Sequence, residues 1–114
     1  MDLNTIYNEN CLDTMKRMPD NFIDLTVTSP PYDNLRTYKG FVFPFEEIAR
    51  QLYRVTKVGG VIVWVVGDAT IKGSETGTSF RQALFFMDCG FRLHDTMIYY
   101  KTHSTPLTHN RYEQ

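Results

Sequence analysis

The sequence predicts an α/β protein built on a partial parallel sheet with helices on both faces. Two β-branched runs carry this prediction, Ile23–Thr28 and Val61–Val66, and the second is continuously apolar, as is typical of a strand covered on both faces. Between them, Phe45–Val55 repeats its apolar residues with the period of a helix. A helix between two strands favours parallel pairing, because a parallel pair needs a crossover connection.

The first part of the chain is expected to form a strand, a helix and a second strand. Thr5–Asn8 is short and β-prone, which predicts the first strand. Asn10 is suited to cap a helix that Pro19 stops. The apolar face of that helix consists of Leu12, Met15 and Met18. Ile23–Thr28 is the second strand, and two prolines close it.

The middle of the chain is expected to form a loop, a helix and a strand. The loop spans Asp33–Pro44, and the helix Phe45–Val55 follows it. The pair Gly59 and Gly60 breaks the helical pattern, because glycine is a poor helix former. Val61–Val66 is then the buried strand.

The last part is expected to form a polar loop, a helix and a strand. Gly67–Gly77 is the loop, and Thr78 or Ser79 caps the helix, which Gly90 ends. The predicted buried face of this helix consists of Phe80, Ala83, Leu84 and Met87. Phe91–Lys101 is a final β-prone run. The expected order is therefore β-α-β-loop-α-β-loop-α-β.

Composition bounds the class of protein. The chain has 114 residues, 42% of them hydrophobic, which suits one domain with a core. The formal net charge of -1 excludes a polybasic protein, so a nucleic-acid partner would have to meet a local basic face. Phosphate contact is open to Arg36, Lys39, Lys101, His103, His109 and Arg111, although solvated surface is the default interpretation of each one taken singly.

Cysteine and histidine usage predicts a reduced protein without a metal. Cys11 and Cys89 are too few for a disulfide framework, and the three histidines share no metal spacing with them. The N-terminus shows no signal peptide, and the longest apolar run is too short to cross a bilayer. We therefore expect a soluble, cytoplasmic protein with no membrane partner.

The segment Ser29-Pro30-Pro31-Tyr32 carries the functional signal. It follows a strand, and ligands of parallel sheets bind beyond the carboxyl ends of strands. Prolines lack an N–H donor, so the segment offers carbonyl acceptors beside the Ser29 hydroxyl and the flat ring of Tyr32. This set suits a planar ligand with an NH2 group, although a Pro-Pro pair by itself favours a plain turn.

Two further segments are weaker candidates. Gly73–Ser79 lacks the lysine and the glycine spacing of a phosphate-binding loop, so it is read as a flexible loop that opens a helix. Asp68 ends the strand before it and could face an active site, but a turn former is the favoured interpretation.

The chain resembles the DNA methyltransferases that methylate the exocyclic amine of cytosine (N4) or adenine (N6). Their signature is [D/N/S]-P-P-[Y/F/W] after an apolar strand, which Ser29–Tyr32 matches. Asn8–Leu12 with Met18–Asn21 resembles the family's G-D-C-L…L-P-D-x-S opening, and Val55–Gly60 resembles its L-K-P-G-G strand entry. Cys89–Phe91 and Ile98–Lys101 resemble its G-F…I-x-W-x-K run. These motifs occur in the same order as in the family, and together they cover nearly the whole chain.

The resemblance implies a Rossmann-like methyltransferase fold, S-adenosylmethionine as cofactor, DNA as partner and a role in restriction-modification. It implies that Ser29, Pro30, Pro31 and Tyr32 form the catalytic segment. There the hydroxyl and the Pro30 carbonyl would accept hydrogen bonds from the amine of a flipped base, on which Tyr32 would stack. It places Asn10 and Cys11 beside the cofactor's adenine and Ser29 near its methionyl part. Asn10 replaces the family's usual aspartate, and its helix-capping role is an equal alternative.

The family's glycine-rich F-x-G-x-G cofactor loop and its target-recognition region are absent from the sequence. We therefore expect residues 1–114 to be a partial catalytic domain, the N-terminal fragment of a larger enzyme. Its sheet would lack strands and expose an apolar edge, and a second chain or copy could complete it. A catalytically inactive nucleic-acid-binding module of the same fold is the alternative. The sequence does not decide between cytosine and adenine as the target base, although serine at the first signature position is commoner in cytosine-N4 members.

Overall fold

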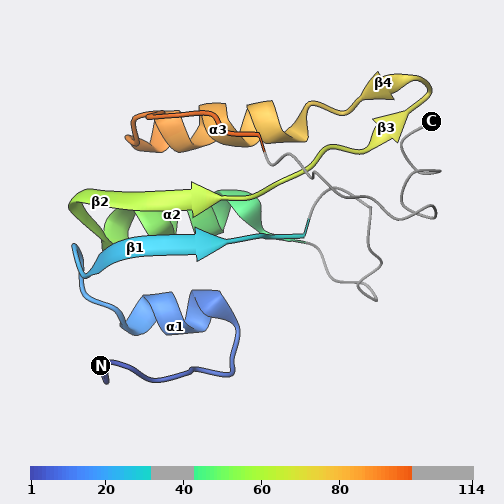
Figure 1. The fold of residues 1–114 in the computed structure, drawn as a ribbon. Helices are drawn as coiled ribbons and strands as arrows, with labels where there is room; N and C mark the ends of the chain where they lie inside the picture. The colour runs from blue at the N-terminus through green and yellow to red at the C-terminus, as the bar shows by residue number, and fades with distance from the viewer. Residues whose placement is uncertain (32–42, 99–114) are drawn as a thin grey trace.

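The computed structural model describes residues 1–31 and 43–98. Strands β1 (Ile23–Thr28) and β2 (Thr56–Trp64) pair in parallel, and helix α2 (Phe45–Val55) connects them. In Figure 1, α2 lies behind the two strands, with α1 (Cys11–Arg17) below and α3 (Thr78–Cys89) above. The predicted α/β class and parallel pairing are confirmed, and so are the bounds of β1 and α2.

The register of β1 and β2 brings their carboxyl ends level. Leu25 pairs with Val61, and Thr28 pairs with Trp64. The register shifts near the start of β1, where Ile23 pairs with Thr56. Beyond the last pair, the Val65 N–H donates to the Thr28 carbonyl at 2.9 Å. The two strands therefore end at one place, side by side.

Strand β2 begins earlier than the sequence indicated, because the two glycines lie inside it. β2 starts at Thr56, directly after α2, and Gly59 adopts φ +86° in the irregular stretch. A Cβ atom on Gly60 would lie 2.9 Å from the Lys57 carbonyl oxygen and 3.1 Å from that of Asp24. The glycines thus permit a close backbone approach between the strands and do not separate helix from strand.

The core lies between the sheet and the helices. Its centre is formed by Ile48, Leu52 and Val55 of α2 with Leu12 and Met15 of α1. Residues that pack around this centre come from the strands, from α3 and from its end, namely Ile23, Ile62, Trp64, Phe86 and Phe91. The core therefore covers one side of the two-stranded sheet.

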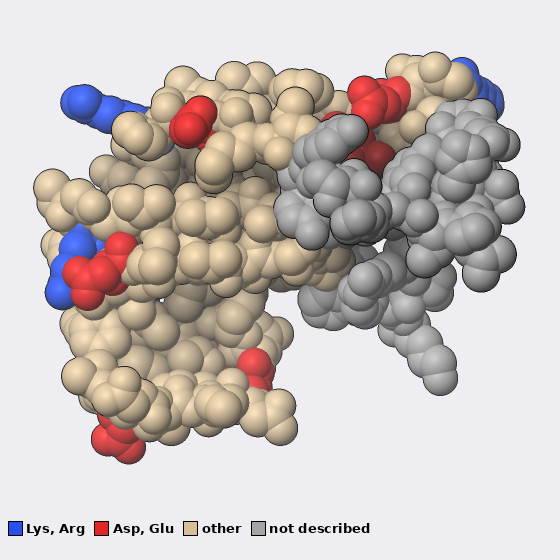
Figure 2. All heavy atoms as spheres, viewed as in Figure 1, with Lys and Arg blue, Asp and Glu red and all other residues tan. Residues whose placement is uncertain are grey.

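The opposite face of the sheet is exposed, so the expectation of helices on both faces is wrong for the described residues. Leu25 and Val27 of β1 are 58% and 64% exposed. Val61 of β2 and Val65, which directly follows β2, are 52% and 44% exposed. Because side chains alternate along a strand, Ile62 and Trp64 turn to the core and their neighbours turn away. Figure 2 shows this face in front, with the charged side chains at its margins.

Helix α3 packs through a different face from the one predicted. Phe80, Leu84 and Met87 are 67%, 60% and 44% exposed. The packed side holds Gln82, which is buried, and Phe86, whose ring centroid lies 5.3 Å from that of Phe45. The aromatic contacts and the Trp64–Gln82 hydrogen bond therefore decide which side of α3 packs, and the predicted apolar stripe does not.

The ends of α3 agree with the prediction in part. Gly90 ends the helix at φ 123°, where the Tyr53 ring would lie 2.7 Å from an added Cβ atom. The N-cap is Gly77, with φ 74°, and not Thr78 or Ser79. Within the predicted loop Gly67–Gly77, β3 (Thr70–Ile71) and β4 (Ser74–Glu75) pair as a short antiparallel hairpin.

Two predicted strands are not seen among the described residues. Residues 5–8 have no regular structure, and Ile6 is 94% exposed. The described part of the last run, residues 91–98, also lacks regular structure. A β-prone segment needs a partner edge, and sequence preference alone does not supply one. The predicted loop Asp33–Pro44 lies outside the described residues except for its last two.

Arg54 joins the end of α2 to the end of α1. Its guanidinium donates to the carbonyls of Met15 at 2.6 Å and Met18 at 2.8 Å, and it pairs with Asp20 at 2.8 Å. Both carbonyls lie at the end of α1. The Met15 carbonyl also accepts from the Met18 N–H at 3.0 Å, and Met18 lies just beyond the last helical residue. Only a planar guanidinium can reach all three acceptors at once.

We predict that Arg54→Lys lowers the free energy of unfolding by about 1–2 kcal/mol, because an ammonium cannot replace these hydrogen bonds together. Urea denaturation of the two purified proteins measures the difference. The matched control is Arg50→Lys, since Arg50 makes an exposed pair with Glu46 at 3.5 Å. The control should stay within about 0.5 kcal/mol of the original protein. Equal effects of the two changes would contradict the role given to Arg54.

Candidate active site

The candidate site lies beyond the carboxyl ends of β1 and β2. Both strands point toward the same side of the molecule in Figure 1, and α1, α2 and α3 all begin on that side. Helix N-termini and strand carboxyl ends therefore face the same region, as in other parallel α/β proteins that bind ligands at this edge.

The signature residues continue the alternation of β1. Ser29 is exposed, Pro30 is buried and Pro31 is half-buried, whereas Tyr32 lies outside the described residues. Ser29 follows the exposed residues Leu25 and Val27, so it continues the exposed face of the sheet. Burial of Pro30 anchors the segment to the core side. The backbone thus presents a hydroxyl at the end of the strand from a fixed position.

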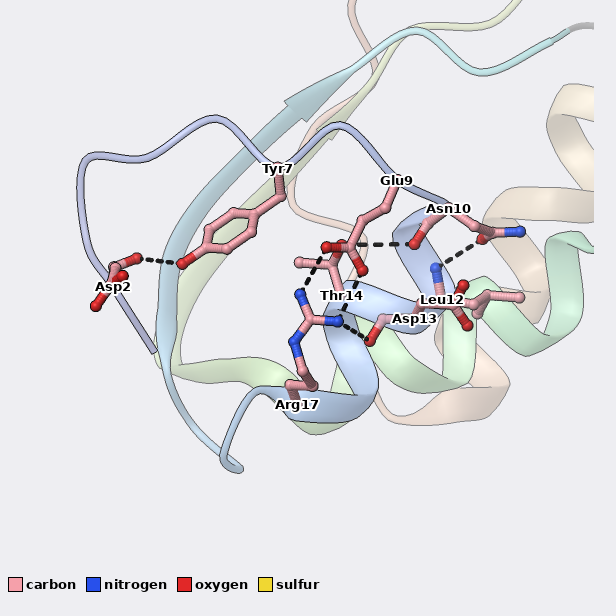
Figure 3. Close-up of polar contacts among 8 residues, drawn as sticks. All are labelled: Asp2, Tyr7, Glu9, Asn10, Leu12, Asp13, Thr14 and Arg17. Atoms are coloured by element: carbon pink, nitrogen blue, oxygen red, sulfur yellow. Dashed lines mark hydrogen bonds and ion pairs between the residues drawn. The ribbon is translucent and has the colours of Figure 1, made fainter.

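The two residues expected at the cofactor stand at the start of α1. Asn10 is the N-cap, and its Oδ1 accepts a hydrogen bond from the Leu12 N–H at 2.9 Å (Figure 3). Cys11 is the first helical residue and is exposed. Partial desolvation raises the pKa of its thiol above the usual value, so the sulfur is a neutral, weakly polar group. The capping role of Asn10 is confirmed.

An ion pair holds the segment before Asn10 against α1. Both oxygens of Glu9 accept hydrogen bonds at 2.7 Å from the guanidinium of Arg17, as Figure 3 shows. The same guanidinium lies 5.8 Å from the centre of the Tyr7 ring, and the Tyr7 hydroxyl donates to the Asp2 carbonyl at 2.8 Å. The contacts fix the approach of the chain to the N-cap.

Asp68 has a structural role that the sequence interpretation missed. Its carboxylate accepts hydrogen bonds from the N–H and the hydroxyl of Ser79, each at 2.8 Å. The carboxylate therefore caps the start of α3, where the backbone donors are unsatisfied. An aspartate after a strand, followed by a helix start rich in Thr and Ser, could have signalled this cap.

A second missed contact joins β2 to α3. The indole N–H of Trp64 donates to the Gln82 side-chain oxygen at 3.0 Å, and Gln82 is buried. Phe43 and Phe45 lie with their ring centroids 6.3 and 5.7 Å from Trp64. Because Trp64 pairs with Thr28, this cluster supports the strand end that precedes Ser29.

Other sequence candidates do not enlarge the site. Across residues 1–31 and 43–98, no group of three His, Cys, Asp or Glu side chains could hold a metal ion. No helix in these two ranges is both long and apolar enough to cross a membrane. The six basic and histidine residues proposed for phosphate contact all lie outside the described part of the chain.

Comparison with known proteins identifies the family. The profile of a family described as DNA methylase matches residues 23–114, and the chain therefore belongs to this N6/N4 DNA methylase family. The orphan methyltransferase M.BamHII of Bacillus amyloliquefaciens is 67% identical over 95 residues, which are 83% of this chain and 36% of that protein.

A second relative is the type II methyltransferase M.BglII of Bacillus subtilis. It is 43% identical over 72 residues, which are 57% of this chain and 20% of that protein. The chain thus spans about a third or less of the length of these curated relatives. No solved structure matches it.

The Glu9–Arg17 pair predicts a pH dependence. Hydrogen bonding by Arg17 holds the pKa of Glu9 below its ordinary value of 4.5. Because the folded pKa is lowered, the pair stabilises the fold above that ordinary value, and the stabilisation is lost as the pH falls through the folded pKa. NMR titration of Glu9 should show the lowered pKa, and Arg17→Gln should restore it. Lys16→Gln, on the same helix, should leave it unchanged.

The Asp68 cap predicts a loss of stability at α3. Asp68→Ala removes both acceptors of Ser79 and should lower the free energy of unfolding by about 1 kcal/mol. Amide hydrogen exchange should become faster in the first turn of α3. Asp95→Ala, at an exposed aspartate after the helix, is the control and should change neither quantity. Unchanged exchange in Asp68→Ala would rule out the cap.

Proposed function

We propose that the chain carries the catalytic segment of a DNA methyltransferase that transfers a methyl group from S-adenosylmethionine to an exocyclic base amine. The observation that carries the proposal is the position of Ser29–Pro31 directly beyond β1, with an exposed Ser29 and a buried Pro30. Family membership supports the same reaction class. Cytosine N4 and adenine N6 present the same NH2 group, and the proposal covers both.

The chemistry of the segment suits a weakly nucleophilic amine. The lone pair of an exocyclic amine is delocalised into the base ring. Acceptance of hydrogen bonds by the Ser29 hydroxyl and the Pro30 carbonyl would draw the nitrogen toward tetrahedral geometry and free its lone pair. The amine nitrogen would then accept the methyl group that the bound cofactor supplies, and the proton that it loses would pass to solvent. Positioning and electrostatics supply the rate, without a covalent enzyme intermediate.

The start of α1 fits one edge of the cofactor. The side-chain oxygen of Asn10 accepts the hydrogen bond of the helix cap. Its amide nitrogen would therefore donate to an acceptor atom of the adenine ring. Cys11 adds an exposed, neutral thiol that can lie against the ring. When bound, S-adenosylmethionine supplies an electrophilic methyl group on its sulfonium sulfur. We propose Asn10 and Cys11 for the adenine and Ser29 for the methionyl part.

The flipped base would complete the site. A base inside a duplex cannot reach the end of β1, so the target nucleotide would leave the stack, with Tyr32 proposed as its stacking ring. We propose residues 1–114 as a partial catalytic domain, because they correspond to 36% of M.BamHII and contain no F-x-G-x-G segment. Cofactor-loop and target-recognition functions are assigned to other parts of the enzyme.

We predict that Ser29→Ala strongly reduces methyl transfer. The test uses M.BamHII in which this chain replaces the matched 95 residues, assayed with labelled S-adenosylmethionine and duplex DNA. Loss of the acceptor should reduce incorporation by about 100-fold or more, as removal of one stabilising group does in other active sites. The matched control is Ser74→Ala, at an exposed hairpin serine, which should keep full activity.

Two outcomes contradict this proposal. Equal incorporation by the original hybrid and its Ser29→Ala variant would remove Ser29 from the reaction. DNA binding without any incorporation, in a hybrid that also fails to bind S-adenosylmethionine, would instead support a non-catalytic nucleic-acid-binding module. Digestion of the labelled DNA to nucleosides identifies the methylated base.

A further inference from the structure

The β3–β4 hairpin turns through two residues, and the first of them is a lysine. Ile71 pairs with Ser74, so Lys72 and Gly73 form the turn. Both have positive φ, 52° and 77°, as in a type I′ turn. Asn, Asp and Gly dominate such turns, and a lysine with positive φ is uncommon. The requirements of the turn therefore do not explain the lysine at this position.

The base of the hairpin is fixed to helix α3. The Thr76 N–H donates to the Ala69 carbonyl at 2.9 Å and closes the hairpin. The guanidinium of Arg81, on α3, donates to the Thr76 carbonyl at 2.8 Å and to the Thr78 hydroxyl at 3.1 Å. Residues 70–75 are all exposed. The hairpin thus projects into solvent from a base that hydrogen bonds hold in place.

The hairpin lies on the side of the molecule that carries the candidate site. In Figure 1, β3 and β4 lie on the side toward which β1 and β2 point. The strand ends meet where the Val65 N–H donates to the Thr28 carbonyl. From Val65 to Lys72 the chain can span at most about 25 Å, which is about seven base-pair steps of duplex DNA. Backbone phosphates near a target nucleotide at Ser29 are therefore within reach of the turn.

The charge of Lys72 is not used within the described part of the fold. There, the Lys72 ammonium group makes no ion pair or hydrogen bond. Most other described basic side chains have such partners, namely Arg17, Arg50, Arg54, Lys57 and Arg81. The carboxylate residue of the hairpin, Glu75, lies at its base opposite Thr70, so the turn is the positive end. With a net charge of -1, the chain can attract DNA only through local basic groups of this kind.

We propose that Lys72 binds a backbone phosphate of the DNA substrate beside the target nucleotide. An ammonium group can donate to a phosphate oxygen without contact to a base, so the bond would position the DNA and not read its sequence. The contact is assigned to the lysine alone, because the Ser74 hydroxyl donates to the Glu75 carbonyl at 3.2 Å within the hairpin. This inference rests on the proposed DNA substrate, but it does not depend on methyl transfer.

The test measures DNA binding by the M.BamHII hybrid that carries this chain, with and without Lys72→Asn. Fluorescence anisotropy of labelled duplex DNA gives the association constant at several salt concentrations. Loss of one phosphate contact should make the slope of log K against log salt shallower by about 0.9, and binding should weaken roughly three- to tenfold at about 0.1 M salt. The loss should be equal for duplexes of two unrelated sequences, because a phosphate contact carries no sequence information.

Further measurements separate the charge from the shape of the turn. Asn-Gly is a favoured pair in a type I′ turn, so Lys72→Asn should leave amide exchange at Thr76 unchanged or slower. A purely structural role of the lysine would instead loosen the hairpin and weaken DNA binding together. Lys72→Arg keeps the charge and should keep the salt slope. Lys16→Gln removes a charge from the last turn of α1, away from the candidate site, and should change neither slope nor affinity (Figure 1).

Four results would overturn the proposal. They are no DNA binding by the hybrid, an unchanged salt slope in Lys72→Asn, an equal loss in Lys72→Arg, and a loss confined to one DNA sequence. The methylation assay is read separately. A hybrid that binds DNA through Lys72 but incorporates no methyl group would contradict the proposed reaction and support this contact. A hybrid whose methylation depends on Ser29 and whose DNA binding ignores Lys72 would do the reverse.

Discussion

The parallel pairing of β1 with β2 is the interaction on which the remaining structure depends. It places Thr28 beside Trp64, and the Val65 N–H extends the ladder to the Thr28 carbonyl. The strands consequently end level, and the segment after β1 leaves the sheet beside the end of β2. A parallel pair also requires a crossover, so the pairing places α2 across one face of the sheet and the core with it. The candidate site and the exposed face of the sheet both follow from this geometry.

Polar contacts fix the helices around this pair. Arg54 binds the end of α1, Asp68 caps the start of α3, and Asn10 caps the start of α1. Each contact binds backbone groups at a helix end, where the helix leaves N–H or C=O groups exposed. Two of the three, Asn10 and Asp68, lie on the side of the molecule toward which the strands point. The groups that hold the helices thus border the region where a base and a cofactor would meet.

The sheet has one packed face and one exposed face. Four apolar side chains are exposed on a sheet whose other face is well packed, and the chain corresponds to about a third of the length of M.BamHII. The proposed catalytic segment adjoins this exposed face, since Ser29 follows the exposed residues of β1. Elements that cover Leu25 and Val27 would therefore also approach the reaction site.

The sequence by itself determined the elements whose signals are local. The residue patterns predicted the bounds of β1 and α2 to the residue, and Asn10 was correctly predicted as a helix N-cap. The Ser29–Tyr32 signature after a strand indicated the family. Only the tertiary structure decided which faces are buried. Phe80 and Leu84 form a good apolar stripe but lie in solvent, because Gln82 and Phe86 meet Trp64 and Phe45. Thr5–Asn8 and the start of Phe91–Lys101 form no strands, since strand formation requires a paired edge. Secondary-structure preference depends on neighbouring residues in the sequence, whereas the burial of a side chain depends on residues that are far away in the chain.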